Sequence, residues 1–276
     1  MKRSRRIQSW LLNVSLLPLA LLWLMPLYLM IVFATRPDFE IFSTPTPLSF
    51  GPHFMSNFRD LQARTNFVRA IGNSVMVSGL FTFFSIIVTS MAGYAFARFR
   101  FAGRNVIFTI VIATLTLPYL AVVIPQYILI AREFRISNTY FAVVLPYLAN
   151  ALGVFFMRQN FLSLPQAMLD AARVDGAGEL RIFAQIALPL VRPAMAALAI
   201  ILFLTAWTDY LWPLLVLSEP SMQTAPVALA SLIGLTRISW GGIMVGAVLM
   251  TVPFLLLFLF LQRYFVAGIT AGAVKS

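Results

Sequence analysis

Residues 70–97 read AIGNSVMVSGLFTFFSIIVTSMAGYAFA, a run without one charged side chain. About 20 such residues in a helix cross the hydrocarbon core of a bilayer. The apolar residues follow one another instead of alternating with polar ones, which indicates helices rather than barrel strands. Comparable uncharged runs occupy residues 7–35, 105–131, 136–157 and 238–262, and the run 193–208 continues past Asp209 to Ser218.

The fold class predicted from these runs is all-α, a polytopic membrane protein with six transmembrane helices. The predicted spans are about 11–33, 70–95, 106–130, 137–157, 194–217 and 241–262. We expect residues 1–276 to form a single membrane domain, because no internal repeat or low-complexity linker divides them. Residues 36–69 are predicted to be an irregular but anchored excursion between the first two spans.

Prolines interrupt several of the predicted spans, as at Pro118 and Pro146, and remove backbone hydrogen bonds there. Such prolines are either static kinks or hinge points. Small residues at Gly72 and Gly79 are expected to let helices pack closely.

The composition excludes several classes of site. Hydrophobic residues make up 61% of the chain, charged residues 11%, and the mean hydropathy is +0.89, so most of the chain must face lipid. There is no cysteine, and the lone His53 cannot build a metal site unaided. We therefore expect no metal and no catalytic residue. The net charge of +11 is spread in short clusters between apolar runs, which does not favour nucleic-acid binding.

The basic residues predict the orientation, since lysine and arginine are retained on the cytoplasmic side. With the N-terminus inside, the inner segments hold Lys2, Arg3, Arg5, Arg6, Arg98, Arg100, Arg104, Arg158, Arg173, Arg181, Arg192, Arg263 and Lys275. The outer segments hold Arg36, Arg59, Arg64, Arg69, Arg132, Arg135 and Arg237. With this orientation, thirteen of the 20 basic residues lie inside and seven outside, which predicts that both termini are in the cytoplasm. The alternative interpretation of the first span is a signal peptide, but the uncharged run 7–35 is long for the apolar region of one.

The inner segment 158–192 is too long for a simple turn between helices. Ser163-Leu164-Pro165 is typical of a helix start, and residues 166–174 have good helical propensity. The glycines at 176 and 178 should break this helix, Glu179 favours a new N-terminus, and Leu188-Pro189 ends the second piece. The segment is therefore predicted to be a helix–turn–helix at the membrane surface, with a shape suited to docking.

The spacing within this loop is specific. Asp170, Ala171 and Ala172 are followed after three residues by Gly176, and after nine more by Ile186, Ala187, Leu188 and Pro189. It resembles the cytoplasmic loop called the EAA motif in permease subunits of bacterial binding-protein-dependent ABC importers. Asp170 stands where that family usually has Glu, which keeps the charge on a shorter stem.

Other stretches resemble the six-helix permeases of carbohydrate importers of the maltose transporter type, and the likeness covers nearly the whole chain. These stretches are Arg98 to Arg104, Trp207 to Pro213 and Gln262 to Lys275.

The resemblance implies a permease subunit in the cytoplasmic (inner) membrane of a prokaryote. Its implied partners are a second homologous permease, most simply in a heterodimer, two cytoplasmic ATPase subunits and an extracytoplasmic substrate-binding protein. No cofactor is expected on this chain. ATP and Mg²⁺ would be used by the partner ATPase, because the sequence has no Gly-x4-Gly-Lys-Ser/Thr phosphate loop. The segment 165–189 would couple this permease to the ATPase.

Asp209 is the only carboxylate inside a predicted span, where a charge is costly unless it faces a cavity or a partner. Together with Trp207, Tyr210 and Trp212 it is the candidate substrate path, since aromatic rings provide stacking surface for a sugar. The competing interpretation is an interfacial aromatic belt, with Asp209 paired to a neighbouring helix.

The predicted function is import of a sugar, meaning a di- or oligosaccharide or a related polyol or amino sugar. The alternatives are a permease for glycerol phosphate-type compounds and an ion-coupled secondary transporter. The secondary transporter is disfavoured because such proteins usually show inverted repeats and several buried ionisable residues. A membrane-embedded enzyme is disfavoured because acid–base and metal ligands are scarce.

Overall fold

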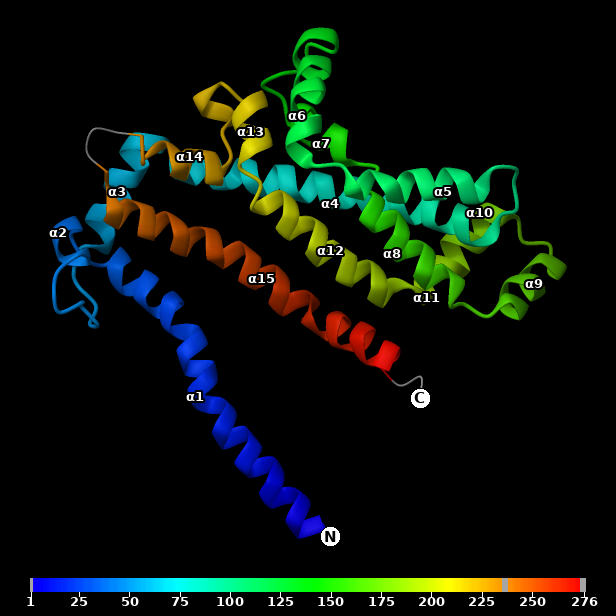
Figure 1. Ribbon diagram of the computed structural model, residues 1–276, viewed down its shortest axis with the longest axis horizontal. Helices are drawn as coiled ribbons and strands as arrows, with labels where there is room; N and C mark the ends of the chain where they lie inside the picture. Colours follow the sequence, from blue (N-terminus) through cyan, green and yellow to red (C-terminus); the bar gives the residue numbers. More distant parts are fainter. Residues whose placement is uncertain (1, 235–237, 274–276) are drawn as a thin grey trace. The chain divides into compact units, whose positions relative to one another are not determined.

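The computed structural model describes the backbone of residues 2–234 and 238–273, and side chains within residues 16–234, 238–260 and at Gln262. Every regular element in these residues is a helix (Figure 1). The chain forms two compact units, residues 1–67 with 229–252 and residues 68–228 with 253–276. Arg237 and Lys275, two of the basic residues that predict the orientation, lie outside the described residues.

In the first unit, two side chains hold the segment after α1 (Lys2–Ala34) by hydrogen bonds to backbone groups at helix ends. Asn57 Nδ2, on α3 (Phe54–Thr65), donates to the carbonyl oxygens of Ala34 (3.0 Å) and Arg36 (2.8 Å) at the end of α1. Asp38, on α2 (Asp38–Ile41), accepts from the backbone N–H of Gly241 (2.8 Å) at the start of α15 (Trp240–Ala273). Helix ends leave such backbone groups without partners, so these contacts anchor the excursion as predicted. The excursion is only partly irregular, because α2 and α3 lie within it.

Three helices are long and apolar enough to cross a membrane unbroken: α1 over Leu16–Ala34, α4 (Phe67–Arg98) and α15 over Trp240–Phe260. Up to three more candidates are bent pairs. α5 (Arg104–Ala113) with η1 (Thr114–Thr116) meets α6 (Tyr119–Ile128) with η2 (Leu129–Glu133) at 103°. α7 (Tyr140–Val144) with η3 (Leu145–Tyr147) meets α8 (Ala151–Leu162) at 50°, and Glu179–Leu190 meets α12 (Arg192–Trp207) at 78°.

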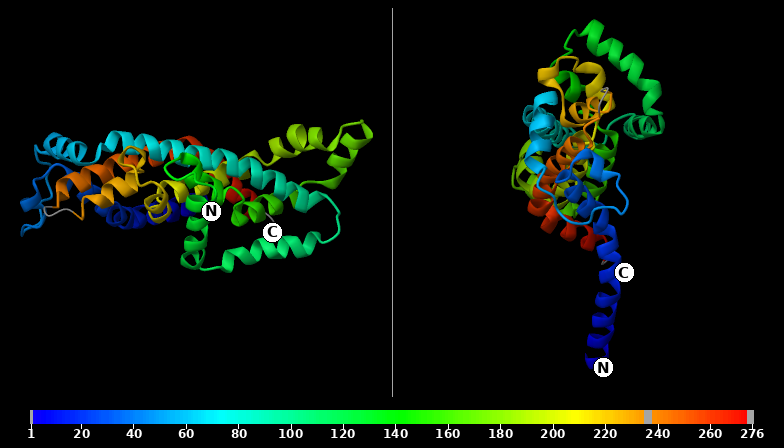
Figure 2. Two further views of the ribbon diagram at one scale, coloured as in Figure 1. Left: turned by 90° about the horizontal axis from the view of Figure 1, so that it is seen from above. Right: turned by 90° about the vertical axis from the view of Figure 1, so that its left-hand side faces the viewer.

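The elbow between α5 and α6 is plain in Figure 2. It follows from Pro118, which keeps Leu117 extended (ψ 127°), because a residue before proline avoids the helical region. Thr114 Oγ1 donates to the Val111 carbonyl oxygen (2.7 Å) and Thr116 Oγ1 to that of Ala113 (2.8 Å), which satisfies carbonyls where the ladder stops. The predicted span 106–130 is therefore not one straight helix.

The predicted span 194–217 is also divided. α12 ends at Trp207 and α13 (Leu211–Val216) begins after a short break that contains Asp209. Beyond it come η5 (Pro220–Met222) and α14 (Ala225–Ser231).

In the second unit, α4 and α8 approach closely at two glycines. A Cβ at Gly153 would lie 2.8 Å from Thr89 Cγ2, and one at Gly93 would lie 2.8 Å from the Met157 Cβ. Gly72 and Gly79, for which the sequence suggested this role, have nothing within 4 Å of an added Cβ. A core packs around the crossing, with Met157, Phe161, Leu198, Leu202 and Trp212 buried.

Candidate functional site

The loop after α8 is the helix–turn–helix that the sequence predicts. It holds α9 (Gln166–Val174), α10 (Glu179–Ile182), a π-helical turn η4 (Phe183–Ala187) and α11 (Leu188–Leu190). Figure 1 shows α9 projecting at the extreme end of the second unit.

Gly176 ends α9 in a left-handed conformation, with φ +80°. The Gly176 N–H donates to the Arg173 carbonyl (3.0 Å) and the Ala177 N–H to the Ala172 carbonyl (3.0 Å). These two bonds form a Schellman cap, in which glycine is the preferred left-handed residue. The four-residue spacing from Ala172 to Gly176 is therefore the spacing of a helix end.

Motif residues also build a small core inside the loop. Leu169, Ala172 and Ile182 are buried together, and Ala177 and Ile186 pack against them. The small Ala172 side chain lets α9 and α10 approach each other. These contacts join α9 to α10 within the loop.

Leu188, in contrast, packs against the main core of the second unit, and so ties the loop to the helices. Pro189 is the second residue of α11, which directly follows the π-helical turn 183–187. Proline has no N–H and its ring crowds the preceding turn, which explains the irregular helix before it.

A polar network spans the two helices of the loop and centres on Arg173. Its guanidinium donates to Glu179 Oε1 (2.7 Å) and Asp170 Oδ1 (2.6 Å), and Gln166 Nε2 also donates to Asp170 Oδ1 (3.0 Å). The hydrogen bonds to Glu179 and then to Asp170 raise the pKa of Arg173 above its usual range. Asp170 thus forms its hydrogen bonds within its own loop, and its side chain, shorter than the usual Glu, is long enough to reach Gln166 and Arg173.

Arg98 at the end of α4 braces this network from outside the loop. It donates to Gln166 Oε1 (2.7 Å), to the Leu164 carbonyl (2.7 Å) and to the Phe161 carbonyl. The Tyr94 hydroxyl donates to Glu179 Oε2 (3.4 Å). One side chain of α4 therefore holds the end of α8 and the start of α9 together.

Apolar side chains stand exposed on either side of the turn. Val174 is 87% exposed and Leu180 is 76% exposed, and Ala171 and Gly176 are also exposed. The side chains of Val174 and Leu180 make the tip of the loop a candidate interaction surface.

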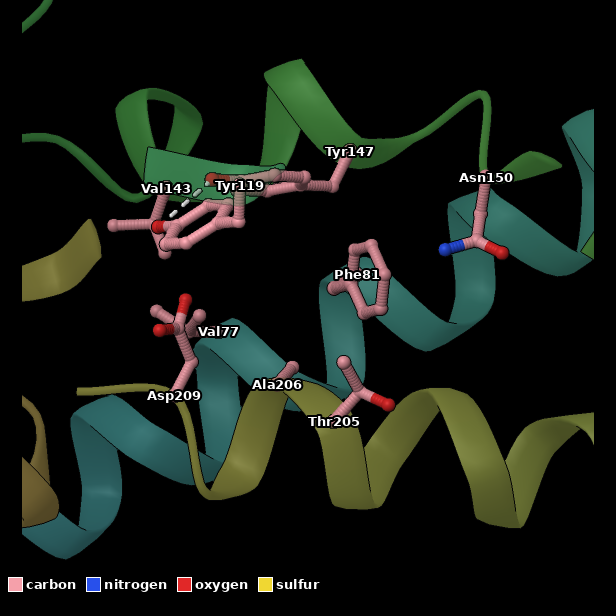
Figure 3. A pocket seen from close by; sticks show the side chains of 9 residues that line it. All are labelled: Val77, Phe81, Tyr119, Val143, Tyr147, Asn150, Thr205, Ala206 and Asp209. Atoms are coloured by element: carbon pink, nitrogen blue, oxygen red, sulfur yellow. Dashed lines mark hydrogen bonds between the residues drawn. The ribbon is translucent and has the colours of Figure 1, made fainter. Parts of the chain in front are cut away.

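A separate cavity of about 260 Å³ lies in the second unit, and Asp209 is part of its wall (Figure 3). The other lining residues come from α4, α6, α7, η3, α12 and the residue before α8. They are Val77, Phe81, Tyr119, Val143, Tyr147, Asn150, Thr205 and Ala206.

The other residues of the predicted substrate path lie elsewhere. Trp207 is 3% exposed and stacks on Phe203 with centroids 5.6 Å apart. Trp212 is fully buried and donates to the Ala142 carbonyl (3.0 Å). Tyr210 is exposed but does not line the cavity. The cavity aromatics are Phe81, Tyr119 and Tyr147 instead.

Sequence reasoning missed Tyr119 and Tyr147, although a signal for them exists. Each directly follows a proline at a helix break, Pro118 and Pro146. The Tyr147 hydroxyl donates to the Tyr119 hydroxyl (3.3 Å), so the two breaks converge on one wall of the cavity.

Comparison with known proteins gives consistent matches. Residues 85–271 match the family described as binding-protein-dependent transport system inner membrane component. The chain is 37% identical to the arabinooligosaccharides transport system permease protein of Halalkalibacterium halodurans, over 100% of this chain and 99% of the relative. It is 35% identical to the sn-glycerol-3-phosphate transport system permease protein of Yersinia pestis, over 93% and 94%.

Among solved structures, a bacterial ABC transporter involved in the import of the acidic polysaccharide alginate has a similar fold. The TM-score is 0.78 at 21% identity, over 95% of this chain and 98% of that chain.

Proposed function

Because the chain belongs to the family of binding-protein-dependent transport system inner membrane components, we propose that it is the permease subunit of an ATP-driven importer. The proposed cargo is a sugar, either an oligosaccharide or a related polyol or amino sugar. The full-length similarity to an arabinooligosaccharide permease supports this class. The similarity to a glycerol phosphate permease supports the alternative, a glycerol phosphate-type compound.

In this proposal the chain is one membrane domain that crosses the inner membrane of a prokaryote six times, with both termini in the cytoplasm. The three unbroken apolar helices, the two bent pairs α5 with α6 and α7 with α8, and the apolar helix α12 support six crossings. The excess of basic residues in the loops that include 158–192 supports a cytoplasmic position for that loop.

The helix–turn–helix at 165–189 is proposed to dock into an ATPase subunit. The observation that carries this assignment is the exposed pair Val174 and Leu180 beside the glycine turn. The loop has its own core, and its polar side chains bond among themselves and to Arg98, so it can move as a rigid lever.

The complete importer would contain a second, homologous permease, two ATPases and an extracytoplasmic binding protein. ATP and Mg²⁺ would be bound by the ATPases. The family description itself names dependence on a binding protein, which supports that partner.

We expect the reconstituted importer to take up its solute only with ATP on the side of the ATPases. Uptake should persist when ionophores collapse the proton and sodium gradients, because ATP hydrolysis drives the conformational change. The measurement is radiolabelled solute uptake into proteoliposomes, with a non-hydrolysable ATP analogue as control. Uptake without ATP that stops with the ion gradient would instead identify a secondary transporter.

A further inference from the structure

The charge of the cavity wall distinguishes between the two proposed cargo classes. Of the nine lining residues, Asp209 is the one with a charged side chain, and the set contains neither lysine nor arginine. A phosphate-binding site normally presents arginine, lysine or a helix N-terminus to the anion. This wall presents a carboxylate instead.

The carboxylate of Asp209 is held in place by the chain itself. It lies beside the backbone N–H groups of Tyr210, Leu211 and Trp212 at the start of α13. Figure 3 shows it directed toward the Tyr119 hydroxyl across the cavity. A carboxylate has about four lone-pair positions, so it can still accept from a ligand hydroxyl.

The neutral polar groups complete a surface suited to hydroxyls. Because Tyr147 donates to Tyr119, the Tyr119 hydroxyl proton can be offered to a ligand. Asn150 Oδ1 accepts from the Gly153 N–H (2.9 Å), which leaves its amide N–H groups as donors. Thr205 donates to the Ile201 carbonyl (2.8 Å), and its oxygen can still accept.

We infer that this cavity binds one neutral, hydroxyl-rich unit, such as a sugar ring, and that Asp209 both accepts from that unit and excludes anionic solutes. This inference rests on the proposed function and specifies its substrate class. The rings of Phe81 and Tyr119 provide apolar faces against which a sugar ring can stack. The volume of about 260 Å³ lies just below the range of about 300–1,000 Å³ typical of ligand pockets, which suits one ring rather than an oligosaccharide.

The exclusion follows from electrostatics. A phosphate monoester carries between one and two negative charges at neutral pH, and its repulsion from a carboxylate is strongest where water is scarce. A sugar hydroxyl instead donates to the same carboxylate, and hydrogen bonds to charged groups are the stronger kind. One residue therefore favours one class and rejects the other.

The test measures binding to the complete importer in nanodiscs, without its binding protein, by saturation-transfer NMR titration. The probes are arabinotriose and sn-glycerol 3-phosphate. Wild type should bind arabinotriose and not glycerol 3-phosphate. Asp209→Asn should weaken arabinotriose binding about tenfold and admit glycerol 3-phosphate, since the amide keeps the shape and loses the charge. Glu133→Gln, which removes an equal charge from an exposed site, should change neither.

Tyr119→Phe provides a second variant that does not disturb the start of α13. It should weaken arabinotriose binding by about fivefold, the effect of one lost neutral hydrogen bond, and still exclude glycerol 3-phosphate. If Asp209→Asn fails to fold, the inference is tested by the preference of wild type for arabinotriose over glycerol 3-phosphate and by the binding of both probes to Tyr119→Phe.

Equal binding of the two probes by wild type, no binding of arabinotriose, or unchanged discrimination in a folded Asp209→Asn variant would overturn the inference. ATP-dependent uptake is measured in parallel with the same purified importer, reconstituted into proteoliposomes together with its binding protein. Uptake without discrimination overturns the cavity inference alone. Discrimination without ATP-dependent uptake overturns the proposed function alone.

Discussion

Replacing Gly176 with valine is expected to abolish ATP-dependent uptake and to release the ATPase from the purified importer. The left-handed conformation at φ +80° costs an ordinary L-residue about 1–2 kcal/mol, and a β-branched residue more. A cost of about 1.4 kcal/mol lowers the equilibrium constant for forming the native turn tenfold. An added Cβ meets nothing within 4 Å, so the effect within this chain comes from the backbone and not from a clash.

Gly176→Asn is the matched control, because asparagine tolerates the left-handed region. It should keep most of the uptake if backbone conformation is what matters. Loss in both variants would indicate that the ATPase needs the space beside Gly176. Normal uptake and normal co-purification of the ATPase with Gly176→Val would show that this turn is not the docking element.

Replacing Arg98 with methionine is expected to lower uptake by about tenfold or more while the ATPase remains bound. The substitution removes the donor that joins Gln166 to the carbonyls of Phe161 and Leu164. Each hydrogen bond from a charged donor contributes about 1.5–3 kcal/mol, and the abandoned carbonyls lose their partner. The loop keeps its own core and exposed surface, so it should still dock but transmit motion poorly.

Arg100→Met separates this effect from topology, since it removes the same positive charge from the same turn. Arg100 is exposed, and its variant should transport normally. Arg98→Lys should be intermediate, because lysine keeps the charge but lacks the forked geometry that reaches several acceptors. The measurements are uptake, ATPase co-purification and ATP hydrolysed per solute imported. If Arg98→Met showed normal uptake and a normal ratio of ATP hydrolysed to solute imported, this role of Arg98 would be contradicted.

The loop could be predicted in detail because its signals are local. The helix over 166–174 and the break at Gly176 depend on neighbours within a few residues, and both are present. The long uncharged runs predicted helices for the same reason, but not their bends. The 103° elbow depends on Leu117 and Pro118 together with space that only the folded chain provides.

The cavity could be predicted only in part, because its wall is assembled from distant segments. Asp209 was found by its charge in an apolar run, which needs no knowledge of neighbours. Trp207 and Trp212 were associated with it by sequence proximity, yet their rings are buried in the core. Helix rotation decides which neighbour shares a face with Asp209, and here the breaks at Pro118 and Pro146 bring Tyr119 and Tyr147 to it instead.

The ion pairs of Arg173 with Asp170 and Glu179 bear on the ionic strength at which the importer works. Dissolved salt weakens attraction between exposed charges on two proteins over a distance of about 10 Å. Burial of apolar side chains such as Val174 and Leu180 is not weakened in this way. Because Asp170 and Glu179 share the positive charge of Arg173 within the loop, the proposed contact with an ATPase should depend more on the apolar side chains than on charge, and therefore little on the salt content of the cytoplasm. A cell whose internal osmolarity rises and falls would keep the two engaged.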